Sequence, residues 1–420
     1  METTPPAAGS TRVRTSPLRT AIERFARDES HERRQAVEAA RGPEAALLAR
    51  EGEVDWLPYG PSDSDAIACE ILANAGPLEL EYAAIRSGVG IFDANHQGTL
   101  VVRGGDRREF LQRMLTADLR EFPPGRVSEA FWLNRKGRID ADLLLGEFGT
   151  QIVAAVDLHS AAAAAASLER FVVSEDVEIA DASDSFHHLW LLGPRSGALL
   201  EAASEAAAPA PPSASIHTIA DTECLAISQD WVGAAGQVLV VPADRVAAVW
   251  EALLQTEVAG TRQRVRPVGW LAFNVARIES GTPLFQVDFG SEALPHETGV
   301  LARRVSFRKG CYLGQEVVAR MESLGKPKQR LVGLRPRGDL LPVAGAQIFA
   351  LEEGSMGPCV GQVTSSTPSP MLGAAPIAFA MVRSSHADDG TEVLVNAEGE
   401  QVVATVVPLR FVAAAAGEVR

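Results

Sequence analysis

The sequence has few cysteines, and their spacing excludes two structural classes. Only four occur in 420 residues, at positions 69, 224, 311 and 359, and no two of them form a C-x-x-C pair. Four are too few for a disulfide-stabilised scaffold, and their separations match no paired zinc-chelating pattern. We therefore expect a chain that folds around an apolar core in a reducing compartment, and we predict a cytoplasmic location and no metal site.

Long apolar runs and several common catalytic motifs are also missing. No apolar run reaches the ~18 residues that a membrane-spanning helix needs, so we expect no membrane partner. The first 20 residues lack the apolar core of a secretory signal and are predicted to be a disordered tail. The phosphate loop G-x-x-x-x-G-K-[ST], the dinucleotide fingerprint G-x-G-x-x-G, the elbow G-x-S-x-G and the zinc motif H-E-x-x-H are absent. These absences argue against common nucleotide-binding, hydrolase and zinc-protease chemistries.

Basic residues are in the minority, 39 against 54 acids, which gives a formal net charge of −15. This balance disfavours a generic polyanion binder, so we expect no nucleic-acid partner. Residues 303–337 reverse the balance, because they hold ten Lys or Arg and two acids. Cations concentrated in an acidic protein indicate a site for a small polyanion, and a solvated basic face is the alternative.

The order of patterns along the chain predicts three regions: a helical or disordered extension (1–60), a mixed α and β region (61–330) and a C-terminal β domain (331–420). Residues 20–50 predict one or two surface helices appended to the main body. Six short β runs after residue 330 predict a small antiparallel barrel or sandwich. In the middle region we expect strands at 98–103, 129–133, 139–145, 188–192 and 237–241. We expect helices after Asp106, at 161–171 and at 243–254, and Ser160 is the predicted N-cap of the second one. Residues 204–216 are predicted to form an exposed loop.

The most informative segment is R-K-G-C-Y-L-G-Q-E-V-V-A-R, residues 308–320. Gly310 permits a close backbone approach beside Cys311, and Arg308 and Lys309 place positive charge next to the thiol. Nearby cations lower the pKa of a thiol and make it nucleophilic. The segment thus indicates a reactive or ligand-facing thiol, with a buried, inert cysteine in a turn as the alternative.

Residues 309–316 resemble the K-G-C-[YF]-x-G-Q-E signature of YgfZ-like folate-binding proteins, which are relatives of the glycine cleavage T-protein (aminomethyltransferase). Residues 90–98 resemble the T-protein pattern G-x-F-D-x-S-H-x-G, and further similar segments lie at 104–111, 193–194, 276–281 and 361–370. The resemblance spans roughly residues 80–410. It implies an α+β fold, a T-protein-like ring of folate-binding subdomains with a C-terminal antiparallel β-barrel.

The resemblance implies tetrahydrofolate, or another reduced folate, as the cofactor. Cys311 is then the functional thiol, and cations such as Lys309 and Arg320 hold the carboxylate tail of the folate. The implied cofactor-binding residues are Lys309, Tyr312, Gln315, Glu316, Arg320, Arg277, Glu279 and His96. Arg277 and Glu279 alternate on a segment that we interpret as strand-like, where they form either a same-face pair or ligand contacts.

A second catalytic candidate lies in residues 137–143, which are similar to the G-x-I-x-D-D-L segment of T-proteins. Asp142 takes the second aspartate position and Ala141 the first. The resemblance implies that this carboxylate positions the reacting amine and the folate nitrogen. Asp140 would point to the same face of a strand as Asp142, and a solvated acid is the simpler interpretation of each.

One departure weakens the folate prediction. Residues 231–236 read W-V-G-A-A-G where T-proteins have a Y-T-G-E-D-G-like segment, whose carboxylate meets the pterin ring. Losing one charged hydrogen-bond partner costs about 1.5–3 kcal/mol, or roughly 10- to 100-fold in affinity. Either another acid such as Glu279 substitutes, or folate binds weakly, or it does not bind.

The sequence therefore favours a YgfZ-like tetrahydrofolate-binding protein that supports iron–sulfur cluster assembly or repair, with iron–sulfur client or assembly proteins as partners. This role is implied by the resemblance alone. The first alternative is a folate-dependent aminomethyltransferase or demethylase that passes a one-carbon unit to tetrahydrofolate. The second is a non-enzymatic scaffold that has lost folate binding. Whether the chain is an enzyme stays open at this point.

Overall fold

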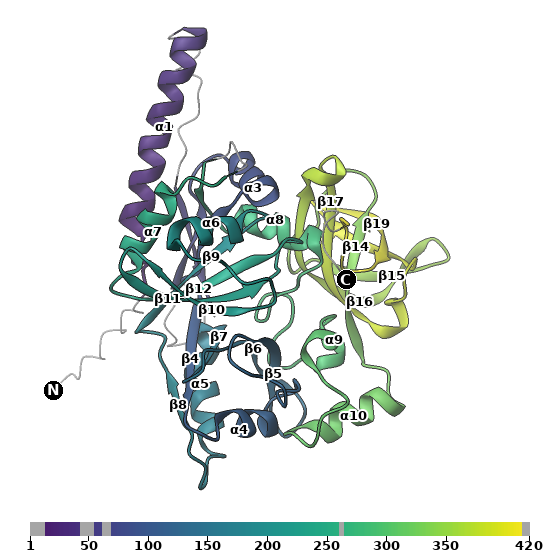
Figure 1. Ribbon diagram of the computed structural model, residues 1–420. Helices are drawn as coiled ribbons and strands as arrows, with labels where there is room; N and C mark the ends of the chain where they lie inside the picture. Colours follow the sequence, from purple (N-terminus) through teal and green to yellow (C-terminus); the bar gives the residue numbers. More distant parts are fainter. Residues whose placement is uncertain (1–12, 43–53, 61–68, 260–263, 414–420) are drawn as a thin grey trace, which may run out of the picture.

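The computed structural model describes residues 13–42, 54–60, 69–259 and 264–413. Two β-sheets form the centre of the molecule, and a β-barrel built by the C-terminal residues lies beside them (Figure 1). Among the described helices, none is both long enough and apolar enough to cross a bilayer.

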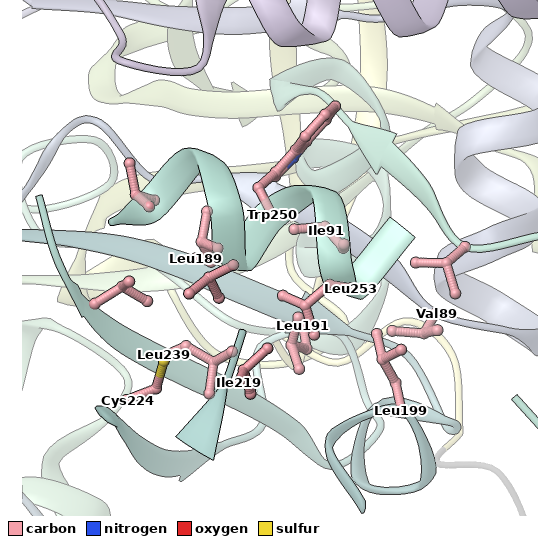
Figure 2. Packing of buried hydrophobic residues seen from close by; sticks show 14 of the residues in the cluster. Val89, Ile91, Leu189, Leu191, Leu199, Ile219, Cys224, Leu239, Trp250 and Leu253 are labelled. Atoms are coloured by element: carbon pink, nitrogen blue, oxygen red, sulfur yellow. The ribbon is translucent and has the colours of Figure 1, made fainter. Parts of the chain in front are cut away.

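The first central sheet has six strands in the order β10-β11-β12-β9-β3-β13, and only β13 and β3 pair in parallel. Alternation along β9 gives this sheet two buried faces, because successive side chains of a strand point to opposite sides. Leu189 and Leu191 pack against helix α7 (Val246–Gln255), as Figure 2 shows, whereas Trp190 belongs to the cluster on the other face. The strands are β3 (Gly90–Asp93), β9 (Phe186–Leu192), β10 (Ala214–Ile219), β11 (Thr222–Gln229), β12 (Gly236–Pro242) and β13 (Arg266–Val268).

The second central sheet has five strands in the order β5-β6-β7-β4-β8. One face packs on helices α4 (Arg107–Met114) and α5 (Leu158–Glu169). Its other face supplies Leu144 and Ala155 to the same cluster as Trp190, so the two sheets pack face to face. The strands are β4 (Gln97–Arg103), β5 (Val127–Leu133), β6 (Ile139–Glu147), β7 (Ile152–Asp157) and β8 (Glu178–Asp181).

The C-terminal strands close into a six-stranded antiparallel barrel in the order β14-β17-β16-β15-β18-β19. This confirms the predicted fold class, mixed α and β structure followed by a C-terminal barrel, and each predicted β run lies within one barrel strand. The strands are β14 (Gln329–Pro336), β15 (Gln347–Glu352), β16 (Ser355–Ser369), β17 (Ala375–Arg383), β18 (Glu392–Ala397) and β19 (Glu400–Val407).

Helix α7 begins at Val246, three residues later than predicted, and β10 begins at Ala214, so the predicted loop at 204–216 extends three residues too far. Two further local predictions are wrong. Residues 276–280 belong to helix α8 (Trp270–Ser280), not to a strand, and α8 begins after Gly269 and ends at Gly281 with a φ of 77°. Helix α5 begins three residues earlier than predicted, because the N-cap is Asp157, whose Oδ1 accepts a hydrogen bond from the backbone N–H of His159 at 2.9 Å. The error at α8 concerns the period of the apolar pattern, which is that of a helix and not of a strand. The error at α5 concerns the residue at which the helix begins.

The N-terminal segment is built into the central region instead of being appended to it. Leu18, directly before helix α1 (Arg19–Arg41), and Ile22 within it are fully buried in the same core as Leu189 and Leu191. Ala26 and Glu29 are also buried, and the C-terminal end of α1 projects away from the body (Figure 1). Strand β1 (Asp55–Tyr59) pairs with β2 (Cys69–Asn74). Most of the tail predicted for residues 1–20 lies outside the described residues. A second helix within residues 20–50 would also lie outside them. The remaining α-helices are α3 (Leu78–Ser87), α6 (Ser196–Ser204), α9 (Leu301–Arg304) and α10 (Gln315–Leu324).

A buried ion pair joins the central region to the barrel. The guanidinium of Arg277 on α8 lies 2.7 Å from Asp288 Oδ2 and donates to Ser365 Oγ of β16 at 2.7 Å. Asp288 Oδ1 accepts from the hydroxyl of the same serine. Arg277 and Asp288 have no exposed side-chain surface, so this contact holds α8 against the barrel wall.

Arg277→Ala leaves the buried carboxylate of Asp288 without its cation, and we expect it to lower the free energy of unfolding by about 3–5 kcal/mol in urea titrations. Arg337→Ala is the matched control, because its partner Glu392 is exposed, and it should cost no more than about 1 kcal/mol. Equal effects of the two substitutions would contradict this account of the contact.

Candidate functional site

A pocket lies between the two central sheets, where strands β6 and β7 separate. Leu144 of β6 pairs with Ala155 of β7, and Asp142 and Asp157 each lie two residues beyond that pair, on the same face of the sheet. The empty space, including the open mouth, is about 610 Å³. The lining residues include Tyr59, His96, Glu129, Asp142, Asp157, Trp190, Gln229, Trp231, Phe285 and Arg304.

One wall of the pocket is an ion-pair network centred on Arg304 of α9. Arg304 Nε donates to Asp142 Oδ1 at 2.8 Å, and Nη1 lies 3.3 Å from Glu129 Oε2. Arg303 binds both oxygens of Glu129 at 2.8 Å, and Gln229 Nε2 donates to Oε1 at 2.7 Å. Glu129 is therefore fully engaged, whereas no hydrogen bond from the described residues reaches Asp142 Oδ2.

The carboxyl groups of Asp142 and Glu129 in this wall have pKa values that are shifted in opposite directions. Burial raises the pKa of Asp142, and the adjacent Arg304 only partly offsets that effect. Burial also acts on Glu129, but the charges of Arg304 and Arg303 outweigh it and lower the pKa. Asp142 is thus the carboxyl group of the pair that is better suited to take up a proton or to meet a ligand.

Another wall of the pocket combines a third carboxylate, that of Asp157, with aromatic rings. The hydroxyl of Tyr59 donates to Asp157 Oδ2 at 2.6 Å, and the Tyr59 ring lies 4.9 Å from the ring of His96. Burial raises the pKa of Asp157, and burial together with the Asp157 carboxylate raises the pKa of Tyr59. Burial lowers the pKa of His96 to about 3, so its imidazole is neutral at neutral pH.

Two tryptophans complete the aromatic surface. The ring centroids of Trp190 and Trp231 are 3.7 Å apart, and Trp190 lies 5.1 Å from His96. The indole Nε1 of Trp190 and the Nδ1 of His96 are both buried, and neither has a hydrogen-bond partner among the described residues. Buried polar atoms without partners are rare, and in a pocket they indicate a place where a ligand or water binds.

Of the residues predicted from the sequence, Asp142 and His96 line this pocket and the others do not. Arg277 lies in the buried contact with the barrel. Glu279 is buried with Tyr82, Arg86 and Ser369, and its Oε2 accepts from the hydroxyl of Tyr82 at 2.6 Å. Neither residue lines the pocket, so Glu279 does not replace the acid that is missing from residues 231–236.

The segment around Cys311 also lies outside the pocket. Lys309 Nζ is buried and donates to three backbone carbonyls, those of residues 112, 115 and 117, at 2.5–2.7 Å. Its ammonium also lies 5.2 Å from the ring centroid of the buried Tyr312. All three donors of Lys309 are therefore occupied within the protein, while Cys311 is exposed.

The other predicted ligands follow on α10, where Gln315 is half-buried and Glu316 and Arg320 are exposed. Glu316 and Arg320 contribute to a separate surface hollow with Val317, Met321 and Gly325. The basic run does not gather at one anion site, because several of its cations pair with acids from distant parts of the chain. These pairs are Arg303 with Glu129, Arg304 with Asp142, Arg330 with Asp388 and Arg337 with Glu392.

Tyr59, Glu129, Asp157 and Arg304 were not found by sequence reasoning. Tyr59 lies before the segments that carry the family resemblance, and Glu129 and Asp157 look like ordinary acids at strand ends. Arg304 was noted only as one cation of the basic run. Pairing of β5 with β6 and of β6 with β7 gathers these acids, and no local pattern records that pairing.

The family comparisons agree with this architecture. Residues 74–309 match the GCVT N-terminal domain, and residues 329–412 match the glycine cleavage T-protein C-terminal barrel domain. The glycine cleavage system aminomethyltransferase T of Bartonella henselae has the same fold, with a TM-score of 0.73 at 23% identity over 88% of this chain and 97% of that one. Two central sheets and a closed barrel thus define a protein of the T-protein fold.

The chain belongs to the glycine cleavage T-protein family. The aminomethyltransferase of Geobacillus kaustophilus is 31% identical over 350 residues, which cover 81% of this chain and 92% of that protein. The aminomethyltransferases of Streptomyces coelicolor and Bacillus subtilis are 29% and 27% identical, covering 84% and 85% of this chain and 94% and 96% of those proteins.

The buried His96 generates a pH prediction. Its folded pKa of about 3 lies below the unfolded value of about 6.5, so between these values the unfolded chain binds a proton that the folded chain does not. The free energy of unfolding should therefore fall as the pH falls through this range. We expect His96→Gln to reduce this dependence by up to about 1.4 kcal/mol per pH unit in urea titrations below pH 6. The exposed His31→Gln is the control, and an unchanged slope for His96→Gln would contradict the assignment.

Proposed function

We propose that this protein is a tetrahydrofolate-dependent one-carbon transferase, of the aminomethyltransferase or demethylase type, and that Asp142 is its principal catalytic carboxylate. The observation that carries this proposal is the placement of Asp142, with one free oxygen, in the central pocket of a chain that belongs to the T-protein family. This is the function that the sequence offered as its first alternative.

The pocket residues fit a reduced folate. Asp142 offers a carboxylate oxygen to the N–H groups of a pterin, and Trp231 and Phe285 offer flat apolar surface to its ring. The partnerless Nε1 of Trp190 offers a donor to its carbonyl oxygen. Trp231 occupies the segment in which T-proteins have an acid, so we expect binding that depends more on ring contacts and less on charge than in those proteins.

When bound, tetrahydrofolate supplies the nitrogen that receives the one-carbon unit. Asp142 accepts a hydrogen bond from the reacting N–H and takes up the proton that leaves it, which its raised pKa favours. Arg304 fixes the Asp142 side chain through Oδ1 and leaves Oδ2 to the ligand. Glu129 in turn fixes Arg304 through the contact of its Oε2 with Nη1.

The iron–sulfur function and the YgfZ-like subtype stay predictions from the sequence. The relatives described above are named for aminomethyl transfer, and none of those names refers to iron–sulfur proteins. Cys311 is exposed but does not line the pocket, so the geometry gives it no part in the proposed transfer. We therefore rank one-carbon transfer above cluster maintenance.

Asp142→Asn should lower tetrahydrofolate-dependent loss of a methyl or aminomethyl group from a productive donor by at least about 100-fold, because the amide cannot accept the proton. The measurement is product formation by mass spectrometry across a panel of donors. Asp140→Asn is the matched control, since Asp140 is two residues away on β6 but binds Asn134 outside the pocket. Equal activity of the two variants would contradict the role of Asp142.

Cys311→Ser should leave the same transfer reaction within about twofold of the wild type, because the thiol lies outside the pocket. The same variant tests the iron–sulfur hypothesis in cells that lack the gene. Failure of Cys311→Ser to restore cluster-dependent enzyme activity, where the wild-type chain restores it, would support that hypothesis over ours.

A further inference from the structure

A buried carboxyl group outside the pocket joins three segments of the chain. Glu81 of α3 is only 1% exposed. Its Oε1 accepts a hydrogen bond at 2.7 Å from the backbone N–H of Ala75, which directly follows β2. Its Oε2 accepts a hydrogen bond, also at 2.7 Å, from the backbone N–H of Gly269, which directly precedes α8. One side chain of α3 therefore holds the end of β2 and the start of α8 together.

The two segments that Glu81 holds are in close backbone contact. A Cβ atom at position 269 would lie 2.2 Å from the carbonyl oxygen of Ala73, so only glycine permits this approach. The C-terminal half of α8 is held separately, by the buried pair of Arg277 and Asp288. Loss of the Glu81 contact would therefore free the start of α8 without freeing the whole helix.

The first residue of α8 connects this contact to the pocket. The ring centroid of Trp270 lies 5.8 Å from that of His96 and 6.1 Å from that of Tyr59. Both of these residues line the pocket, and the hydroxyl of Tyr59 binds Asp157. Because Trp270 directly follows Gly269, the position of the Gly269 backbone determines where the indole ring packs.

The charge of Glu81 is not balanced by a cation of its own. Arg266 on β13 is bound to Glu29 of α1, with the two charged groups 2.9 Å apart. Burial raises the pKa of Glu81 from 4.5 to about 7, and the backbone N–H groups and the charge of Arg266 only partly oppose that effect. The other charged side chains on β2, β3, α8 and α3 have partners of their own, apart from the exposed Glu79; they are Glu70, Asp93, Arg277, Glu279 and Arg86.

The raised pKa makes the contact sensitive to pH. If the start of α8 moves away, water reaches the Glu81 carboxyl group and its pKa returns toward 4.5. Between 4.5 and about 7 the closed contact therefore binds a proton that the opened contact releases. Opening becomes easier as the pH rises through this range, so the closed contact is most stable when Glu81 is neutral.

We propose that Glu81 is a positioning residue of the pocket. In its neutral form it holds the start of α8, and with it the ring of Trp270, against His96 and Tyr59; in its ionised form it holds them less firmly. The pocket is thereby better ordered below neutral pH than above it. The consequence for folate binding rests on the proposed function, whereas the consequence for α8 does not.

The first test measures amide hydrogen exchange in the full-length protein without a ligand. In the wild type, the protection factors of the Ala75 and Gly269 amides should fall by up to about tenfold per pH unit between about pH 5 and pH 7. Glu81→Gln imitates the neutral carboxyl group, so its protection factors should not depend on pH in this range. Glu79→Gln, on an exposed position of the same helix, is the matched control and should behave like the wild type.

Two results of this test would overturn the proposal. One is protection of Ala75 and Gly269 that does not change with pH in the wild type. The other is a decrease with pH that is equally large in Glu81→Gln.

The second test measures tetrahydrofolate binding by calorimetry at about pH 6 and pH 8. The ratio of the dissociation constant at the higher pH to that at the lower pH should be about three- to tenfold larger for the wild type than for Glu81→Gln. The other titrating groups of the pocket are present in both proteins, so the difference between them reports Glu81. Trp270→Leu should remove this excess but keep the pH dependence of exchange at Gly269, and it keeps the test available if Glu81→Gln does not fold.

The outcomes separate this proposal from the proposed function. Equal ratios in the wild type and Glu81→Gln would overturn the positioning role at the pocket. Absence of any tetrahydrofolate binding would contradict the proposed function, and the exchange measurement would still decide whether Glu81 controls the start of α8.

Discussion

The pocket depends on one buried guanidinium. Glu129 and Asp142 lie on adjacent strands of one sheet face, and two unpaired carboxylates there would repel each other at low dielectric. Arg304 joins them from α9, at the end of the matched N-terminal domain. It therefore compensates the negative charges of Glu129 and Asp142 and orients the Asp142 side chain. The same contacts hold α9, which precedes the barrel in the chain, against the second central sheet.

The buried carboxylates have different partners on the two walls of the pocket, the wall around Arg304 and the wall around Asp157. On the Arg304 side every carboxylate has a cation, and the protein gains a rigid, orienting network. On the Asp157 side the hydroxyl of Tyr59 and backbone N–H groups at the start of α5 meet the carboxylate, and no lysine or arginine of the described residues pairs with it.

Sequence reasoning succeeded where a local pattern is sufficient. Short β runs between turn residues predicted all six barrel strands, and motif resemblance identified the T-protein fold. It failed at Arg277 and Glu279, because alternation over four residues does not distinguish a strand from a buried face of a helix such as α8. It also overestimated the basic run, since four of its ten cations pair with acids more than 50 residues away in sequence.

The sequence by itself determined the fold class and the family, because both are recorded in contiguous residues. Of the residues that it predicted for a site, Asp142 and His96 line the central pocket. Only the tertiary structure decided what the site contains. It removed Lys309, Arg277 and Glu279 from the pocket by enclosing them in internal contacts, and it added Tyr59, Asp157 and Arg304 from distant segments. The physical reason is that charge compensation and burial depend on which strands and helices meet, and that depends on pairing across the whole chain.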